Sequence, residues 1–139
     1  MTSTVPAFKT ALASRLRAAL SCAVYYGDPA PDKMADRAVM IGGAKREPLE
    51  WVCGMSQANE VYDLDVAVSI LGPEQETHET LLALAYGINA DIVTSVLGWG
   101  SLPAGVNQVI PAASEDFEDV DGGWREAGVV QTFHVIARI

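Results

Sequence analysis

Two histidines and two cysteines are the residues of this chain best suited to act as nucleophiles, general bases or soft metal ligands. His78 follows an acidic segment and His134 lies in a β-rich segment, and neither belongs to an HxxxH, HExxH or Cys/His cluster. Cys22 and Cys53 are 31 positions apart, form no CxxC and have apolar neighbours, so we interpret them as buried, reduced thiols. The chain is therefore predicted not to be an enzyme.

An acidic run towards the end of the chain is the best candidate for binding a cation. Its carboxylates lack the Asp-x-Asp-x-Asp-Gly spacing of an EF-hand loop. We therefore expect a solvated loop or, if copies of the chain form a ring, a negative zone in the lumen that repels DNA phosphates. The residues of this acidic lumen or loop are Glu115, Asp116, Glu118, Asp119 and Asp121. The sequence predicts no metal site and no other cofactor.

Glycine-rich and basic segments lack the context that phosphate binding requires. Gly98-Trp99-Gly100 follows a predicted helix, whereas a phosphate loop follows a strand and opens a helix. The nine basic residues form no cluster denser than Lys45-Arg46, which argues against nucleic-acid binding because such binding neutralises several phosphates at once.

Three tryptophans, Trp51, Trp99 and Trp124, lie near loops or predicted strand ends. Tryptophan is enriched in interface hot spots, but in a small domain it packs against its own core at least as often. Trp99 is the best interface candidate of the three because its glycine neighbours cannot cover it. We predict a subunit or tube interface that includes Trp99, Leu102 and Trp124.

The composition of the 139 residues is that of one globular domain, residues 1–139, with half of the chain apolar and 19% charged. The longest apolar segment, 81–97, contains Asn89 and Asp91, and the start of the chain lacks a secretion-signal pattern, so we expect a soluble protein that does not associate with membranes. Residues 1–46 hold seven Lys or Arg and three Asp, whereas 47–139 hold fifteen acids and two bases. This polarity either orients copies of the chain head to tail or separates two solvated faces.

The elements that position these residues follow from hydrophobic periodicity and turn residues. A helix is predicted over 6–20, capped by Thr4, and a long one from Gly72-Pro73 to about Leu97. Strands are predicted at 22–27, 37–41, 49–53, 60–71, 106–112 and 124–139. Loops or turns are predicted at 28–36, 42–48, 98–105 and, for the acidic run, 115–123.

The strand at 60–71 decides the type of sheet. Its apolar side chains alternate with Asp63, Asp65 and Ser69, which indicates one buried and one solvated face, as in an antiparallel sheet. The predicted fold class is α+β: a mixed, mainly antiparallel sheet with an N-terminal helix, one long helix packed on it and a closing β-hairpin.

This layout resembles a known family of phage proteins. The resemblance rests on strand-like Val24-Tyr25-Tyr26-Gly27, Met40-Ile41-Gly42, Glu60–Val68 and Val135–Ile139, together with the order of the helices around them. Over nearly the whole chain it is similar to the tail terminator (tail completion) proteins of long-tailed bacteriophages, the lambda-type family. The family has no catalytic residues to carry over.

The resemblance implies a homohexameric ring that caps the tail tube, ends tube polymerisation and provides the surface on which the head docks. The implied partners are other copies of the chain, the tail tube protein and a head–tail connector or neck protein. DNA would pass through the ring without specific binding. The implied location is the neck end of the virion tail, and the host cytoplasm during assembly.

Two alternative functions remain open from the sequence. Another phage neck or tail-tube component would share the solvated strands, the charge polarity and the absence of a catalytic motif. A small α+β enzyme or ligand-binding domain would require a pocket with converging polar groups.

Overall fold

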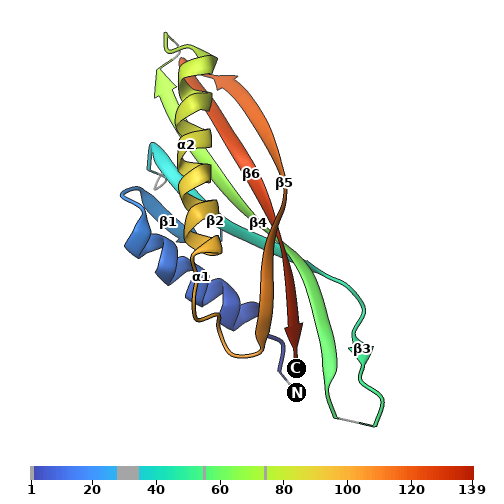
Figure 1. Ribbon diagram of the computed structural model, residues 1–139. Helices are drawn as coiled ribbons and strands as arrows, with labels where there is room; N and C mark the ends of the chain where they lie inside the picture. The colour runs from blue at the N-terminus through green and yellow to red at the C-terminus, as the bar shows by residue number, and fades with distance from the viewer. Residues whose placement is uncertain (1, 28–34, 55, 74) are drawn as a thin grey trace.

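The computed structural model describes residues 2–27, 35–54, 56–73 and 75–139. Its elements, in chain order, are α1 (Val5–Ala19), β1 (Ala23–Tyr26), β2 (Arg37–Arg46), β3 (Glu50–Trp51), β4 (Ala58–Pro73), α2 (His78–Leu97), β5 (Val106–Asp121) and β6 (Trp124–Arg138) (Figure 1). The loop predicted at 28–36 falls mostly outside the described residues.

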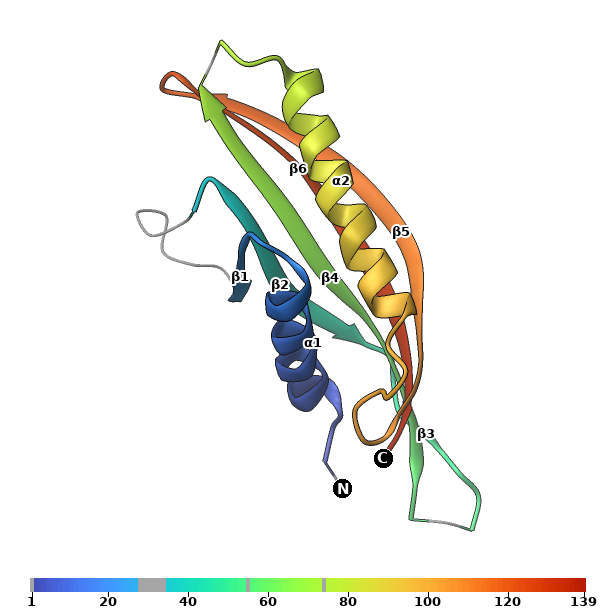
Figure 2. The same cartoon turned by 60° about the vertical axis from the view of Figure 1, so that its left-hand side comes forward.

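One mixed sheet forms the body of the molecule. Its strand order is β1-β2-β4-β6-β5, and β3 pairs with β4 beyond the end of β2. Only β1 and β2 are parallel, and the other pairs are antiparallel. Both helices lie on the same face of the sheet, with α1 over β1 and β2 and α2 along β4, β6 and β5 (Figure 2). The predicted α+β fold class is therefore confirmed.

The core forms between this face of the sheet and the two helices. In β4 the side chains of Leu64, Val66 and Val68 are fully buried, while Asp63 and Asp65 on the opposite face are exposed. The predicted alternation is therefore confirmed for this part of the strand, and its buried face is the one that the helices cover. Ser69, which was expected on the solvated face, is buried, and its hydroxyl donates to Glu126 at 3.2 Å. The helices contribute the buried residues Phe8, Leu12, Ala13, Leu16, Leu81, Ala85, Ile92 and Val96.

Two predicted boundaries around β2 and α2 are wrong. The turn expected at 42–48 is largely strand, because Gly42 and Gly43 form a bulge within β2 rather than ending it. The long helix begins at His78 and not at Gly72-Pro73, since Thr77 is its N-cap and accepts a hydrogen bond from the amide of Thr80. Pro73 is the last residue of β4.

The acidic run is not a loop, which corrects the prediction for 115–123. β5 continues through the run to Asp121 and pairs with β6 along its whole length. The chain reverses at Gly122 and Gly123, whose φ angles of 57° and 87° match a two-residue hairpin turn. The sequence-based interpretation failed because charged side chains are common on an edge strand, where they prevent uncontrolled pairing with other sheets.

Candidate functional site

The three predicted interface residues lie in different environments. Trp99 stacks on Phe8 with ring centroids 5.8 Å apart, and the guanidinium carbon of Arg15 lies 5.3 Å from the centroid of the Trp99 ring. Leu102 is half-buried and packs against the core. Trp124 is 55% exposed at the hairpin between β5 and β6. Their role in an interface stays a prediction, and the exposure of Trp124 makes it the most available of the three.

The strand conformation of the acidic run distributes its carboxylates over two faces. Asp116 and Glu118 face α2, where the Tyr86 hydroxyl donates to Asp116 at 3.2 Å and His78 Nδ1 lies 2.6 Å from Glu118 Oε2. Successive side chains of a strand point to opposite faces of the sheet, so Glu115 and Asp119 lie on the helix-free face. The side chain of Asp121 lies outside the described part of the chain.

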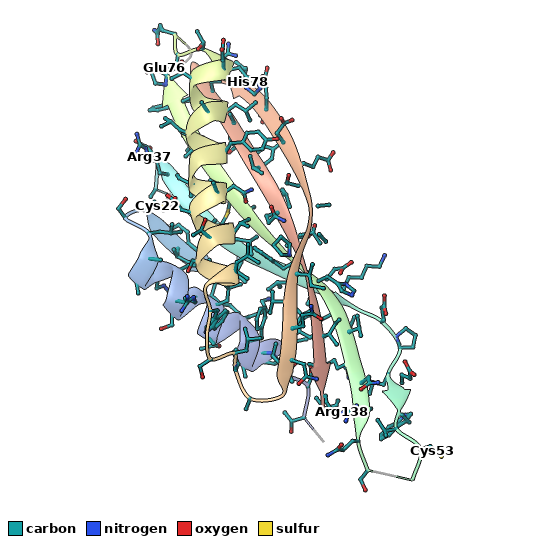
Figure 3. The ribbon with its side chains drawn as sticks, in the orientation of Figure 1. Cys22, Arg37, Cys53, Glu76, His78 and Arg138 are labelled. Atoms are coloured by element: carbon teal, nitrogen blue, oxygen red, sulfur yellow. The ribbon has the colours of Figure 1, made fainter. Side chains whose placement is uncertain are left out.

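The described residues contain no group of three or more His, Cys, Asp or Glu that could hold a metal ion. The two histidines are separated, since His78 begins α2 while His134 Nδ1 lies 2.7 Å from Asp63 Oδ1 on the helix-free face. The two cysteines are free, but Cys22 is half-buried and Cys53 is exposed beyond β3, so the prediction of two buried thiols is wrong for Cys53 (Figure 3). Burial raises the pKa of the Cys22 thiol.

A surface groove of about 390 Å³ lies beside the exposed tryptophan of the hairpin. Its lining consists of Asp36, Leu71, Asp119, Trp124 and Glu126. The lining is three carboxylates, one indole and one aliphatic side chain, with no cationic group that could bind an anion.

A buried carboxylate joins the N-terminal residues to the sheet, and sequence reasoning missed it. Glu60 in β4 is fully buried and accepts hydrogen bonds from the Ser3 hydroxyl at 2.6 Å, the Thr4 amide at 2.8 Å and the Thr4 hydroxyl at 2.6 Å. Arg46 Nε lies 2.9 Å from the same carboxylate. Burial alone raises the pKa of Glu60, but the bonds from Ser3 and Thr4 and the Arg46 charge outweigh it, so the pKa lies below 4.5.

Thr4 is the N-cap residue of α1, as predicted, but its side chain makes no capping hydrogen bond to the helix. Its hydroxyl donates to Glu60 and accepts at 3.1 Å from the hydroxyl of Tyr62, which is itself fully buried. Burial raises the pKa of Tyr62 to about 12. These hydrogen bonds join the N-terminal residues Ser3 and Thr4 to β4 through the Glu60 carboxylate.

The outer face of α2 is unusually apolar for a helix at the surface. The helix is long and apolar enough to cross a membrane by length and composition alone, with a mean hydropathy of 1.5, and only 28% of that stretch is buried. A core helix passes the same test, and the stripe through Leu81, Ala85 and Ile92 does pack against the sheet. Leu84 and Leu97 remain 38% and 64% exposed on its outer side. The molecule therefore presents apolar surface that a partner could cover.

No protein-family model matches the chain, and no curated protein matches it. A chain of the solved structure described as "Virion of native gene transfer agent (GTA) particle" is similar, with a TM-score of 0.67 and 17% identity over 99% of this chain and 100% of that chain. The two chains share their fold. At this identity the likeness concerns the arrangement of the backbone, and it covers every element described above.

Proposed function

We propose that this protein is a structural component of a phage-like virion and has no enzymatic activity. The observation that carries the proposal is the likeness of fold over 99% of this chain to a chain of a gene transfer agent virion. The geometry is compatible with such a role, because the described residues include exposed apolar side chains that a partner could cover.

Within such a particle, the proposed role is that of a tail terminator. The chain would form a ring, with six copies as the expected number, that caps the tail tube, ends its polymerisation and provides the surface for head docking. The support for this finer role is the resemblance of the sequence to lambda-type tail terminators. Its partners would be other copies, the tube protein and a connector or neck protein. It would act at the neck end of the tail after assembly in the host cytoplasm.

The experiment that tests this proposal measures the mass of the purified protein, alone and with the tail tube protein of the same phage or element. A closed ring near six times 14.8 kDa, seen end-on by electron microscopy and bound at one end of each tube, is the expected result. A protein that stays monomeric and leaves tube length unchanged would contradict the terminator role.

Another neck or tail-tube component is the second candidate, because the description of the similar structure names a particle and no position within it. This alternative predicts open polymers, or incorporation along the whole length of the tube. The same micrographs distinguish the two, since a terminator is found only at tube ends.

A further inference from the structure

The two edges of the sheet carry opposite charges. At one edge, α1 covers β1, and residues 1–27 contain three Lys or Arg and no acid. At the other edge, β5 contains no Lys, Arg or His. Both views of the ribbon place α1 and β1 on one side of the molecule and β5 on the opposite side (Figures 1 and 2). A surface of each sign therefore lies on opposite flanks of one molecule.

From this arrangement we infer that the subunits join by docking the basic edge of one copy against the acidic edge of the next. The basic edge is defined by Lys9, Arg17 and Tyr26, and the acidic edge by Glu115, Asp116, Glu118, Asp119 and Val120. This inference rests on the proposed function and deepens it, because it names the partner as a second copy and assigns the two surfaces that meet.

The cations of the basic edge are held in place by the protein itself. Arg17 donates from Nε and Nη2 to the main-chain oxygen of Val24, at 3.2 Å each. In a parallel pair, the main-chain NH and C=O groups of successive residues point alternately towards the partner strand and away from it. The amide of Gly27 donates to the main-chain oxygen of Ile41 in β2, so Val24, three residues earlier, directs its oxygen away from β2, towards the free edge. The Lys9 ammonium lies 4.9 Å from the centroid of the Tyr26 ring, which is 49% exposed. The edge thus combines two ordered cations with an accessible aromatic ring.

The acidic edge has a matching composition. In the described part of the chain, Glu115 and Asp119 form no hydrogen bond or ion pair, so their charges are available to a partner. Val120 is 44% exposed at the same end of the strand. An apolar group within a charged rim is typical of protein interfaces, where opposite charges select the partner and its orientation.

A second copy fits these surfaces better than a nucleic acid. The acidic edge repels phosphates, and two cations are too few to neutralise a stretch of backbone. Main-chain pairing between the edges is also disfavoured, since Arg17 already occupies the outward oxygen of Val24 and β5 contains Pro111 and two register irregularities. A contact between two different surfaces is heterologous, and repeating it produces a closed ring when the rotation from one copy to the next is a whole-number fraction of 360°.

The test uses two full-length variants, each with two reversed charges. K9E/R17E makes the basic edge acidic, and E115K/D119K replaces the two unpaired carboxylates of the acidic edge by lysines, while Asp116 and Glu118 keep their partners Tyr86 and His78 on α2. Each variant alone should self-associate about 10- to 100-fold more weakly than the wild type at low salt, by light scattering. Mixing the two in equal amounts should restore assembly, because in an alternating ring each contact joins either two unchanged edges or two edges whose charges are both reversed.

The control is E47K/E50K, which makes the same change of charge as E115K/D119K on exposed residues beside and within β3, away from β1 and β5. It should assemble as the wild type does, and circular dichroism should show all variants folded. Unchanged assembly of both edge variants, or folded variants that do not assemble when mixed, would overturn the inference while leaving the ring proposal intact. A wild-type chain that stays monomeric with tail tubes would overturn the proposed function, and this inference with it.

Discussion

Replacing Glu60 by Gln tests whether a buried charge anchors the N-terminal segment to the sheet. The carboxylate is fully buried and accepts three hydrogen bonds in addition to its contact with Arg46. Gln preserves the shape but presents an NH₂ group where one oxygen accepted, so a donor from Ser3 or Arg46 loses its partner. Hydrogen bonds to charged groups contribute about 1.5–3 kcal/mol each, and an unpaired buried donor costs a similar amount.

The expected loss for E60Q is therefore about 3 kcal/mol in the free energy of unfolding at neutral pH. With an ordinary urea dependence for a small domain, this corresponds to a midpoint lower by about 1–2 M urea. Tryptophan fluorescence and circular dichroism should report the same transition. The matched control is E47Q, an exposed carboxylate, whose stability should stay within about 0.5 kcal/mol of the wild type.

The pH dependence gives the prediction a second readout. The pKa of Glu60 is lower in the folded protein than its ordinary value of 4.5, so the ionised group stabilises the fold above pH 4.5. This contribution is lost as the pH falls below 4.5 through the folded pKa. The difference in stability between wild type and E60Q should accordingly narrow in acid. A variant as stable as the wild type at neutral pH, or a difference independent of pH, would refute the reasoning.

Three further outcomes are expected. G128A should lower the free energy of unfolding by about 3 kcal/mol, because a Cβ at this position would lie 2.2 Å from the Phe117 ring and 2.3 Å from the main-chain oxygen of Val68. The control G43A should leave stability unchanged, since a Cβ there has nothing within 4 Å, and equal stabilities of the two variants in urea would contradict the prediction. In urea titrations, W99A should lower the free energy of unfolding by about 2 kcal/mol through lost packing on Phe8, whereas W124A should change it by no more than about 0.5 kcal/mol. By light scattering, W124A should weaken assembly. The reverse pattern would assign Trp99 to the interface and Trp124 to the core. Cys53 should react with an aromatic disulfide in the native protein, and a thiol that reacts only in denaturant would argue against its exposure.

The sequence predicted the features of this fold that depend on local periodicity. The two helices, the alternation of β4 and the order of elements follow from side-chain spacing, which reports which face of an element is buried. The predicted ends of helices and strands were wrong where interactions other than hydrophobic periodicity determined them. The Thr77 cap starts α2 later than Gly72-Pro73 suggested, and Gly42 is accommodated as a bulge in β2.

The candidate site was less predictable because it depends on pairs of residues distant in sequence. Ser3 and Glu60 are 57 positions apart, and Asp63 and His134 are 71 positions apart, so no local sequence motif indicates either pair. A buried acid such as Glu60 looks like any charged residue at a strand end. Trp99 was favoured for an interface because its glycine neighbours leave it uncovered, but coverage comes from Phe8 of α1, which only the tertiary structure reveals.

The conformation of β5 bears on how such a chain assembles without aggregating. A long, unpaired edge strand is a template on which any other sheet can add, which would produce open-ended fibres. Here the strand carries four described carboxylates, Pro111 and two register irregularities, and the opposite edge has its outward oxygen at Val24 bonded to Arg17. These devices disfavour main-chain pairing at both edges. Contacts between copies at the edges are therefore expected between side chains, and opposite charges on the two edges favour the pairing of unlike edges over that of like edges.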